Sequence, residues 1–346
     1  MKILKKGFCA IVMAAFLLPA AGRTAVGAEK VIFNLGWIPY GRDISWYYSL
    51  ESGLYKAEGL DVKIVRGYGG GKTAKDIASG KDDFGGMDTA SVILGRARGL
   101  SLKIVVMQHD IAPFVIRTLE GNGVNTLKDL EGKKFGTPAG DATWANFPTL
   151  AKINGFDIKK MKVVHVAPAA RETGLLGGQY AAATGFITQA PIFRRMAAKQ
   201  GRKAKIILLA NQGLDFYGLG YSVTDKTLDT RGGMVRKFLL ASMKGLADVI
   251  GNPEKGMDAL LKNAPTAARG PNREVWDITL DLWLTPDQKR LGLGWMTEKK
   301  WRRTRDIVVK ANNITKHIPL SDLYTNDYLP KILPPKRAPR AFKKLF

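Results

Sequence analysis

The sequence predicts an α/β protein whose two lobes are joined by two crossing segments. Short apolar runs typical of β-strands alternate with helical segments through most of the chain, and this order favours mainly parallel sheets covered by helices. The 346 residues suffice for two hydrophobic cores. A content of 45% hydrophobic and 24% charged residues is typical of a globular protein.

The first unit is expected to contain four strands separated by three helices. The helices close at or shortly before glycines, which readily adopt the left-handed conformation that ends a helix. The strands are predicted at 31–36, 60–65, 84–87 and 102–107, and the helices at 45–56, 72–79 and 90–98.

A second unit begins with an extended crossing segment at 114–117 and again alternates strands with helices. Its strands are predicted in 125–137 (after a helical turn) and at 163–166, 182–187 and 205–209, with helices at 141–154 and around 169–176. A return crossing is predicted at 217–224. Four helices follow, at 233–250, 253–262, 273–284 and 298–310.

The simplest assembly returns the last helices to the first lobe. Residues 29–113 and 224–335 then form a discontinuous lobe I, and residues 114–223 form an inserted lobe II. Residues 336–346 form a basic tail that we expect to be flexible or loosely docked. Ligands of such sheets bind in the crevice at the carboxyl ends of the strands, so a site is expected between the lobes.

The first 28 residues are typical of a cleaved secretory signal peptide. Lys2, Lys5 and Lys6 precede an apolar run, and Val26-Gly27-Ala28 suits signal peptidase. The run is short for a membrane span, although an uncleaved anchor is the alternative. We therefore expect a periplasmic protein with Glu29 at its N-terminus. The single cysteine, Cys9, lies inside the signal, so the mature chain would hold no disulfide and no thiol nucleophile.

The formal net charge is +24. Such a charge can indicate nucleic-acid binding, but a secretion signal argues against it, and we expect no nucleic-acid partner. The basic run at 299–305 is interpreted as a solvated helix face. The positive surface still favours anionic solutes or an anionic membrane face.

The usual signatures of catalysis are missing from the sequence. His109, His165 and His317 show no metal-binding spacing, and no GxSxG elbow occurs. Gly71-Lys72-Thr73 is similar to the end of a P-loop, but Arg66 stands where that motif needs its first glycine. We predict a protein that is not an enzyme and has no cofactor and no metal.

Four motifs in order resemble a known family. Gly36-Trp37-Ile38-Pro39-Tyr40 is followed by matching segments at 51–62, 78–85 and 127–136. Together they resemble the nitrate/sulfonate/taurine and thiamine-pyrimidine-precursor branch of periplasmic solute-binding proteins.

The resemblance implies a type 2 periplasmic-binding fold that closes two lobes on a small-molecule solute. It also implies delivery of that solute to an inner-membrane ABC permease with a separate ATPase subunit. We expect a monomer. A eukaryotic relative in thiamine pyrimidine synthesis is catalytic and depends on histidine and cysteine residues. The expected lack of cysteine in the mature chain argues against that chemistry here.

The candidate ligand-binding residues follow the predicted strands or open the predicted helices. Aromatic rings among them would stack on a planar solute, and helix N-termini and glycine-rich backbone would face it. The candidates are Trp37, Tyr40, Tyr68, Gly70, Gly71, Asp88, Thr89, His109, Asp141, Thr143, Trp144, Thr188, Gln189, Tyr217 and Tyr221.

Two ligand classes remain open from the sequence. A planar, nitrogen-containing solute such as a pyrimidine-like thiamine precursor is the leading one, because Asp88 and Asp141 would accept hydrogen bonds from its amino groups. Gln189, where pyrimidine-precursor binders tend to carry an acidic residue, weakens this hypothesis. The alternative is a sulfonate, taurine or nitrate-type anion held at helix N-termini. A sensor subunit and a secreted enzyme on the same fold are two further alternatives.

Overall fold

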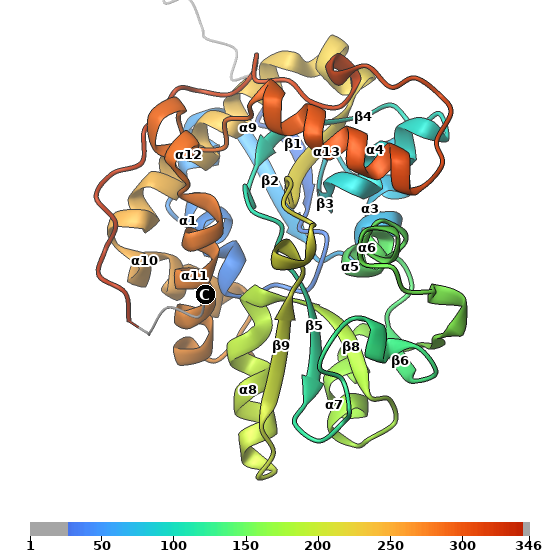
Figure 1. Cartoon of the computed structure of the whole chain (residues 1–346). Helices are drawn as coiled ribbons and strands as arrows, with labels where there is room; N and C mark the ends of the chain where they lie inside the picture. The colour runs from blue at the N-terminus through green and yellow to red at the C-terminus, as the bar shows by residue number, and fades with distance from the viewer. Residues whose placement is uncertain (1–26, 342–346) are drawn as a thin grey trace, which may run out of the picture.

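The computed structural model describes residues 27–341 as two lobes built on two five-stranded sheets (Figure 1). The predicted signal peptide falls outside the described residues except for its last two positions, and so do residues 342–346 of the tail. No helix within the described range is long and apolar enough to cross a bilayer.

The first sheet has the strand order β2-β1-β3-β10-β4. Its strand β1 runs parallel to both neighbours, whereas β10 runs antiparallel between β3 and β4. The strands are β1 (Glu29–Asn34), β2 (Leu60–Val65), β3 (Phe84–Asp88), β4 (Leu102–Met107) and β10 (Leu219–Thr224). The expected end of lobe II at Val223 is therefore too late, because the return segment already belongs to the first sheet.

The second sheet repeats this plan with the order β7-β6-β8-β5-β9. Strand β6 is parallel to β7 and β8, and β5 is antiparallel to β8 and β9. The strands are β5 (Phe114–Leu119), β6 (Lys134–Thr137), β7 (Lys162–His165), β8 (Ala182–Phe186) and β9 (Ala204–Leu208). In each lobe the segment that crosses over thus becomes an antiparallel strand within the sheet.

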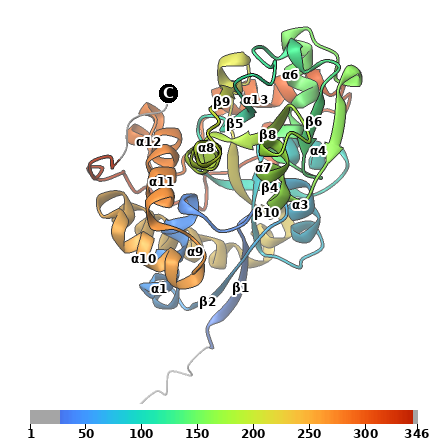
Figure 2. The same ribbon diagram turned by 90° about the horizontal axis from the view of Figure 1, so that it is seen from below.

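Helices cover both sheets. The first lobe holds α1 (Ile44–Glu51), α2 (Leu54–Ala57), α3 (Gly70–Ala78), α4 (Thr89–Ala97), α9 (Asp225–Gly251), α10 (Pro253–Asn263), α11 (Arg269–Trp283), α12 (Pro286–Leu291) and α13 (Glu298–Ala311). The second lobe holds α5 (Ala142–Ala145), α6 (Phe147–Asn154), α7 (Arg171–Leu176) and α8 (Ala190–Lys199). Figure 2 shows α8 of the second lobe beside α11 of the first, where Arg195 and Glu274 form an ion pair of 2.7 Å.

Each lobe has its own hydrophobic core. Phe33, Trp46 and Phe238 pack together in the first lobe, and Phe135 packs against Phe147 in the second. Phe186, at the end of β8, packs against both cores. This ring is therefore a direct apolar link between the lobes.

The described part of the basic tail is docked rather than loose. Arg337 forms ion pairs with Asp277 at 3.2 Å and with Asp281 at 2.7 Å, and Arg340 also pairs with Asp281. The backbone N–H of Ala338 donates to the carbonyl of Ile250 at 3.0 Å. The expectation of a flexible tail is corrected for residues 336–341, because carboxylates on α11 hold their arginines.

Candidate functional site

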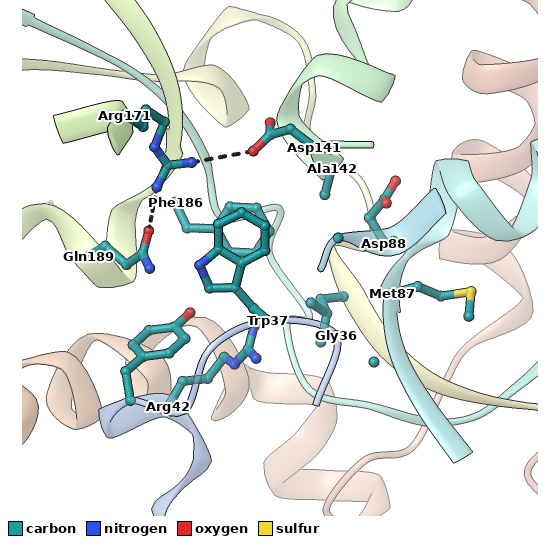
Figure 3. A pocket seen from close by; sticks show the side chains of 15 residues that line it. Gly36, Trp37, Arg42, Met87, Asp88, Asp141, Ala142, Arg171, Phe186 and Gln189 are labelled. Carbon is teal, nitrogen blue, oxygen red and sulfur yellow. Dashed lines mark hydrogen bonds and ion pairs between the residues drawn. The ribbon is translucent and has the colours of Figure 1, made fainter. Parts of the chain in front are cut away.

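A narrow cavity lies between the two lobes (Figure 3). About 420 Å³ of unfilled space separates its lining atoms, but the centre of a water molecule can reach only about 30 Å³ of it, which is room for very few waters. Its walls are Gly36, Trp37, Tyr40, Arg42, Gly69, Gly70, Gly86, Met87, Asp88, Asp141, Ala142, Arg171, Phe186, Gln189 and Leu219. These residues come from both lobes, so the lobes enclose the cavity together.

Trp37 reaches the cavity from the loop after β1. That loop turns at Gly36, whose φ is +77° and where a Cβ atom would lie 2.0 Å from the carbonyl oxygen of Gly86. Only glycine fits such a close approach of two backbones. The backbone N–H of Gly67 donates to the carbonyl of Trp37 at 3.0 Å, and this bond holds the loop in place beneath the indole.

Glycines also form the contact where the lobes meet. Gly69, just before α3, has a φ of +104°, and a Cβ atom there would lie 2.6 Å from the carbonyl oxygen of Gly140 in the second lobe. Gly71 lies next to the same glycine, at 3.7 Å for an added Cβ. The two lobes thus approach backbone to backbone at this edge of the cavity.

Asp88 is the N-cap of α4 and lies on the cavity wall with no solvent exposure. Its carboxylate accepts from the backbone N–H of Ser91 at 3.0 Å and from the Ser91 hydroxyl. No arginine or lysine of residues 27–341 forms a salt bridge with it. Burial raises the pKa of the Asp88 carboxyl to about 6, although the bonds from Ser91 act in the opposite direction.

The arginines at the cavity are already matched by carboxylates. In the second lobe, Arg171 lies 2.9 Å from Glu172 and 3.3 Å from Asp141, and Arg117 pairs with the same Glu172. Arg117 and Arg171 both also donate to the side-chain oxygen of Gln189, at 3.0 Å each. Figure 3 shows the bonds of Arg171 to Asp141 and Gln189.

The first lobe contributes a further matched pair, because Arg42 binds Asp43 at 2.9 Å. Three arginines thus face three carboxylates around the cavity, and Asp88 adds one more negative charge. Of the charged residues that line the cavity itself, Arg42 and Arg171 are balanced by Asp88 and Asp141, so the wall carries no net positive charge despite the basic composition of the protein.

Two side-chain contacts join the lobes across the cavity. The hydroxyls of Tyr40 and Thr188 lie 3.1 Å apart, and the guanidinium of Arg171 lies 5.7 Å from the centre of the Trp37 ring. Aromatic rings attract cations at such distances. Both contacts therefore link the first lobe to the second.

The structure brings six of the sequence candidates to the cavity wall: Trp37, Tyr40, Gly70, Asp88, Asp141 and Gln189. Two others lie directly beside it, because Thr188 binds Tyr40 and Gly71 adjoins the Gly69–Gly140 contact. The remaining seven candidates do not line it.

The candidates away from the cavity have other partners. Tyr217 packs on Trp301, and Tyr221 packs on Trp46 in the first core. The hydroxyl groups of two threonines donate to backbone carbonyls, Thr89 to Tyr217 and Thr143 to Gly185. Trp144 packs on Phe147, Tyr68 is half exposed on the surface, and His109 is buried behind the cavity wall.

Sequence reasoning missed several residues of the wall, notably Arg171, Phe186, Met87 and Leu219. Arg171 opens a helix after a strand of the second lobe, a position that the strand-end rule covers. Phe186 ends β8, two residues before the predicted Thr188-Gln189 pair. The strand-end rule also includes Met87 when it is applied one residue before Asp88, and Phe186 when it is applied two residues before Thr188.

The sequence profile described as NMT1/THI5-like matches residues 43–256. The chain belongs to this family. Riboflavin-binding protein RibY of Chloroflexus aurantiacus is 24% identical over 331 residues, which cover 90% of this chain and 91% of RibY. A Saccharomyces cerevisiae 4-amino-5-hydroxymethyl-2-methylpyrimidine phosphate synthase, THI13, is 27% identical over 66% of this chain and 70% of its own length.

Solved structures share the fold. The ligand-binding component of an ABC-type import system from Staphylococcus aureus has a TM-score of 0.65 at 13% identity and covers 87% of this chain and 97% of its own. The periplasmic aliphatic sulphonate binding protein SsuA of Escherichia coli has a TM-score of 0.61 at 15% identity, with coverage of 87% and 99%. The two-lobed chain therefore has the periplasmic-binding-protein fold.

Proposed function

We propose that this protein is the extracytoplasmic solute-binding component of an ABC importer and captures a planar, nitrogen-containing heterocycle between its lobes. A pyrimidine-like thiamine precursor is the leading example. The observation that carries the proposal is the composition of the cavity wall: aromatic rings from both lobes, paired arginines, and the buried carboxylate of Asp88 without a cationic partner.

The paired arginines of the wall and the carboxylate of Asp88, which has no salt bridge within residues 27–341, favour a neutral or cationic solute over an anion. A sulfonate or nitrate needs a free guanidinium or free N–H donors. Arg171 already binds two carboxylates, and Arg42 is engaged with Asp43. An anion would have to displace one of these groups and would also meet the negative charge of Asp88. A donated N–H, by contrast, adds to the bonds from Ser91 and stabilises the negative charge of Asp88, which has no cationic partner within residues 27–341.

The rings favour a flat solute. Trp37 enters from the first lobe and Phe186 from the second (Figure 3). Tyr40 also lines the cavity. A planar heterocycle between such rings buries both faces and gains stacking energy of about 0.5–1.5 kcal/mol per ring pair beyond its apolar burial. Because the centre of a water molecule reaches only about 30 Å³ of the cavity, we infer that the lobes separate to admit such a ring.

Binding and import are favoured over catalysis by the composition of the site. Of residues 27–341 no residue is a cysteine, and none of the three histidines lines the cavity. The relative named for riboflavin binding matches nearly the whole chain, whereas THI13 matches two thirds of it. The S. aureus import component, which has the same fold, is consistent with a membrane permease as partner.

A ligand screen by thermal shift and titration calorimetry tests the proposal. The mature protein is mixed with 4-amino-5-hydroxymethyl-2-methylpyrimidine, riboflavin, taurine, an alkanesulfonate and nitrate. A heterocycle should raise the melting temperature, because a ligand bound only to the folded state stabilises it. Trp37→Ala should abolish the shift, and Tyr68→Ala, which changes an exposed ring outside the cavity, should leave it intact.

Other results would contradict the proposal. A shift with taurine, sulfonate or nitrate alone would favour the anion-binding alternative. Chromatography of the bound solute after prolonged incubation separates binding from turnover, and any product would show an enzyme.

Mass spectrometry of the protein from the periplasmic fraction should give Glu29 as the first residue.

A further inference from the structure

His109 lies directly behind the cavity wall, at the junction of the two crossing segments. It follows β4 and is fully buried. Its backbone N–H donates to the carbonyl of Leu219, which lines the cavity, and its carbonyl accepts from the N–H of Gly218, both at 2.9 Å. His109 is therefore bonded directly to the backbone of a residue that lines the cavity.

Neither ring nitrogen of His109 has a hydrogen-bond partner within the described part of the chain. Buried polar groups in native proteins nearly always have one, because an unpaired donor or acceptor keeps the full cost of leaving water. Burial and the nearby charge of Arg42 lower the pKa of His109 well below its ordinary value. The ring is therefore neutral at physiological pH and offers one N–H donor and one acceptor.

Phe186 of the second lobe packs against the ring of His109. The Phe186 ring meets the imidazole edge to face, with 6.1 Å between the ring centres and an angle of 67°. Phe186 lines the cavity and packs against the cores of both lobes. When the lobes separate, it has to leave one core, and if it stays with β8 it moves off His109.

We propose that His109 is the floor of an inner compartment of the ligand site, which opens when Phe186 turns aside and holds an uncharged hydroxyl group of the solute. A hydroxyl both donates and accepts, so it satisfies both kinds of hydrogen bond that the neutral imidazole offers. The inference rests on the proposed solute-binding function and adds to it the class of substituent that the ring system carries.

Histidine labelling tests whether the compartment opens. The chain has three histidines, and the two others, His165 and His317, are exposed and serve as internal references. Diethylpyrocarbonate should label His109 in the ligand-free protein at a rate approaching theirs. A saturating solute should protect His109 alone. Resistance of His109 in the ligand-free protein, or equal labelling with and without bound solute, would overturn the proposal.

Binding measurements test the hydrogen bond itself. The probes are 4-amino-5-hydroxymethyl-2-methylpyrimidine against its 5-methyl analogue, and riboflavin against lumiflavin, so that each pair differs in hydroxyl groups. His109→Phe should weaken binding of the hydroxylated member about tenfold, the loss expected for one buried hydrogen bond. It should leave the analogue unchanged, and His109→Gln should restore part of the difference.

The outcomes separate the two proposals. Equal losses for both members of a pair would assign His109 a packing role only and overturn this inference, while the proposed solute binding stands. A parent protein that binds none of the four probes would remove the proposed function and this inference together.

Discussion

Replacing Asp88 by Asn should stabilise the folded protein while weakening solute binding. The amide keeps the shape of the side chain and still accepts from the N–H of Ser91, so the cap of α4 remains. What disappears is a buried negative charge without a cationic partner. Most substitutions of buried polar groups destabilise a protein, so an increase in stability here is a distinctive result.

The magnitude follows from the pKa of the carboxyl. Burial raises it from 3.8 to about 6, and each pKa unit corresponds to about 1.4 kcal/mol. The ionised folded state is therefore destabilised by about 3 kcal/mol at neutral pH. The folded state binds the proton more tightly than the unfolded state, so this penalty is absent below about pH 4, grows between about pH 4 and pH 6, and is complete above about pH 6.

Urea unfolding of the ligand-free parent and variant at about pH 4, 5, 6 and 7.5 measures this difference. Asp88→Asn should match the parent at about pH 4 and exceed it by about 3 kcal/mol at about pH 7.5. Asp129→Asn is a control of opposite sign, because backbone N–H groups of Thr126 and Asn125 lower the pKa of Asp129. A gap that does not grow with pH, or a variant less stable than the parent at the highest pH, would refute the reasoning.

Three further predictions concern the closure of the two lobes, the ion pairs at the cavity and the docking of the basic tail. Gly69→Ala should weaken solute binding at least about tenfold, because its Cβ would hold the lobes apart. Gly59→Ala, also at positive φ but facing open space, should leave binding unchanged in the same calorimetry. Arg171→Met should lower the free energy of unfolding in urea by about 3 kcal/mol, since it leaves the buried carboxylate of Asp141 without its cationic partner. Replacing Arg337 and Arg340 together by Ala should lower the melting temperature by a few degrees, with a smaller effect in high salt.

The sequence predicted most strands because their signals are local. Strands 60–65 and 102–107 were placed to the residue. The helix expected at 45–56 is instead two helices, because Gly53 adopts a φ of +78° between them. The helix expected at 141–154 is interrupted at Asn146, which ends α5 and begins α6. The short α12 and the longer α8 were not predicted.

The site was harder to predict because side-chain direction depends on tertiary packing. Trp37 and Asp88 follow the ends of adjacent parallel strands, and this rule alone brings them to one edge of the sheet. Tyr221 lies in the middle of β10, where successive side chains point to opposite faces, and its ring points into the first core. Arg171 reaches the cavity because Asp141 and Glu172 orient its guanidinium, and such a network spans segments that no local pattern connects.

Asp88 lines the cavity and His109 lies directly behind its wall. Asp88 is buried and forms no salt bridge with residues 27–341, and neither ring nitrogen of His109 has a hydrogen-bond partner in the described chain. Natural proteins tend to break the rules of burial where they function. A solute that donates an N–H to Asp88 and a hydroxyl to His109 would remove both penalties at once. Binding would then stabilise the protein beyond the contribution of ring stacking, and the double variant that combines Asp88→Asn with His109→Phe should lose that excess while keeping the stacking on Trp37.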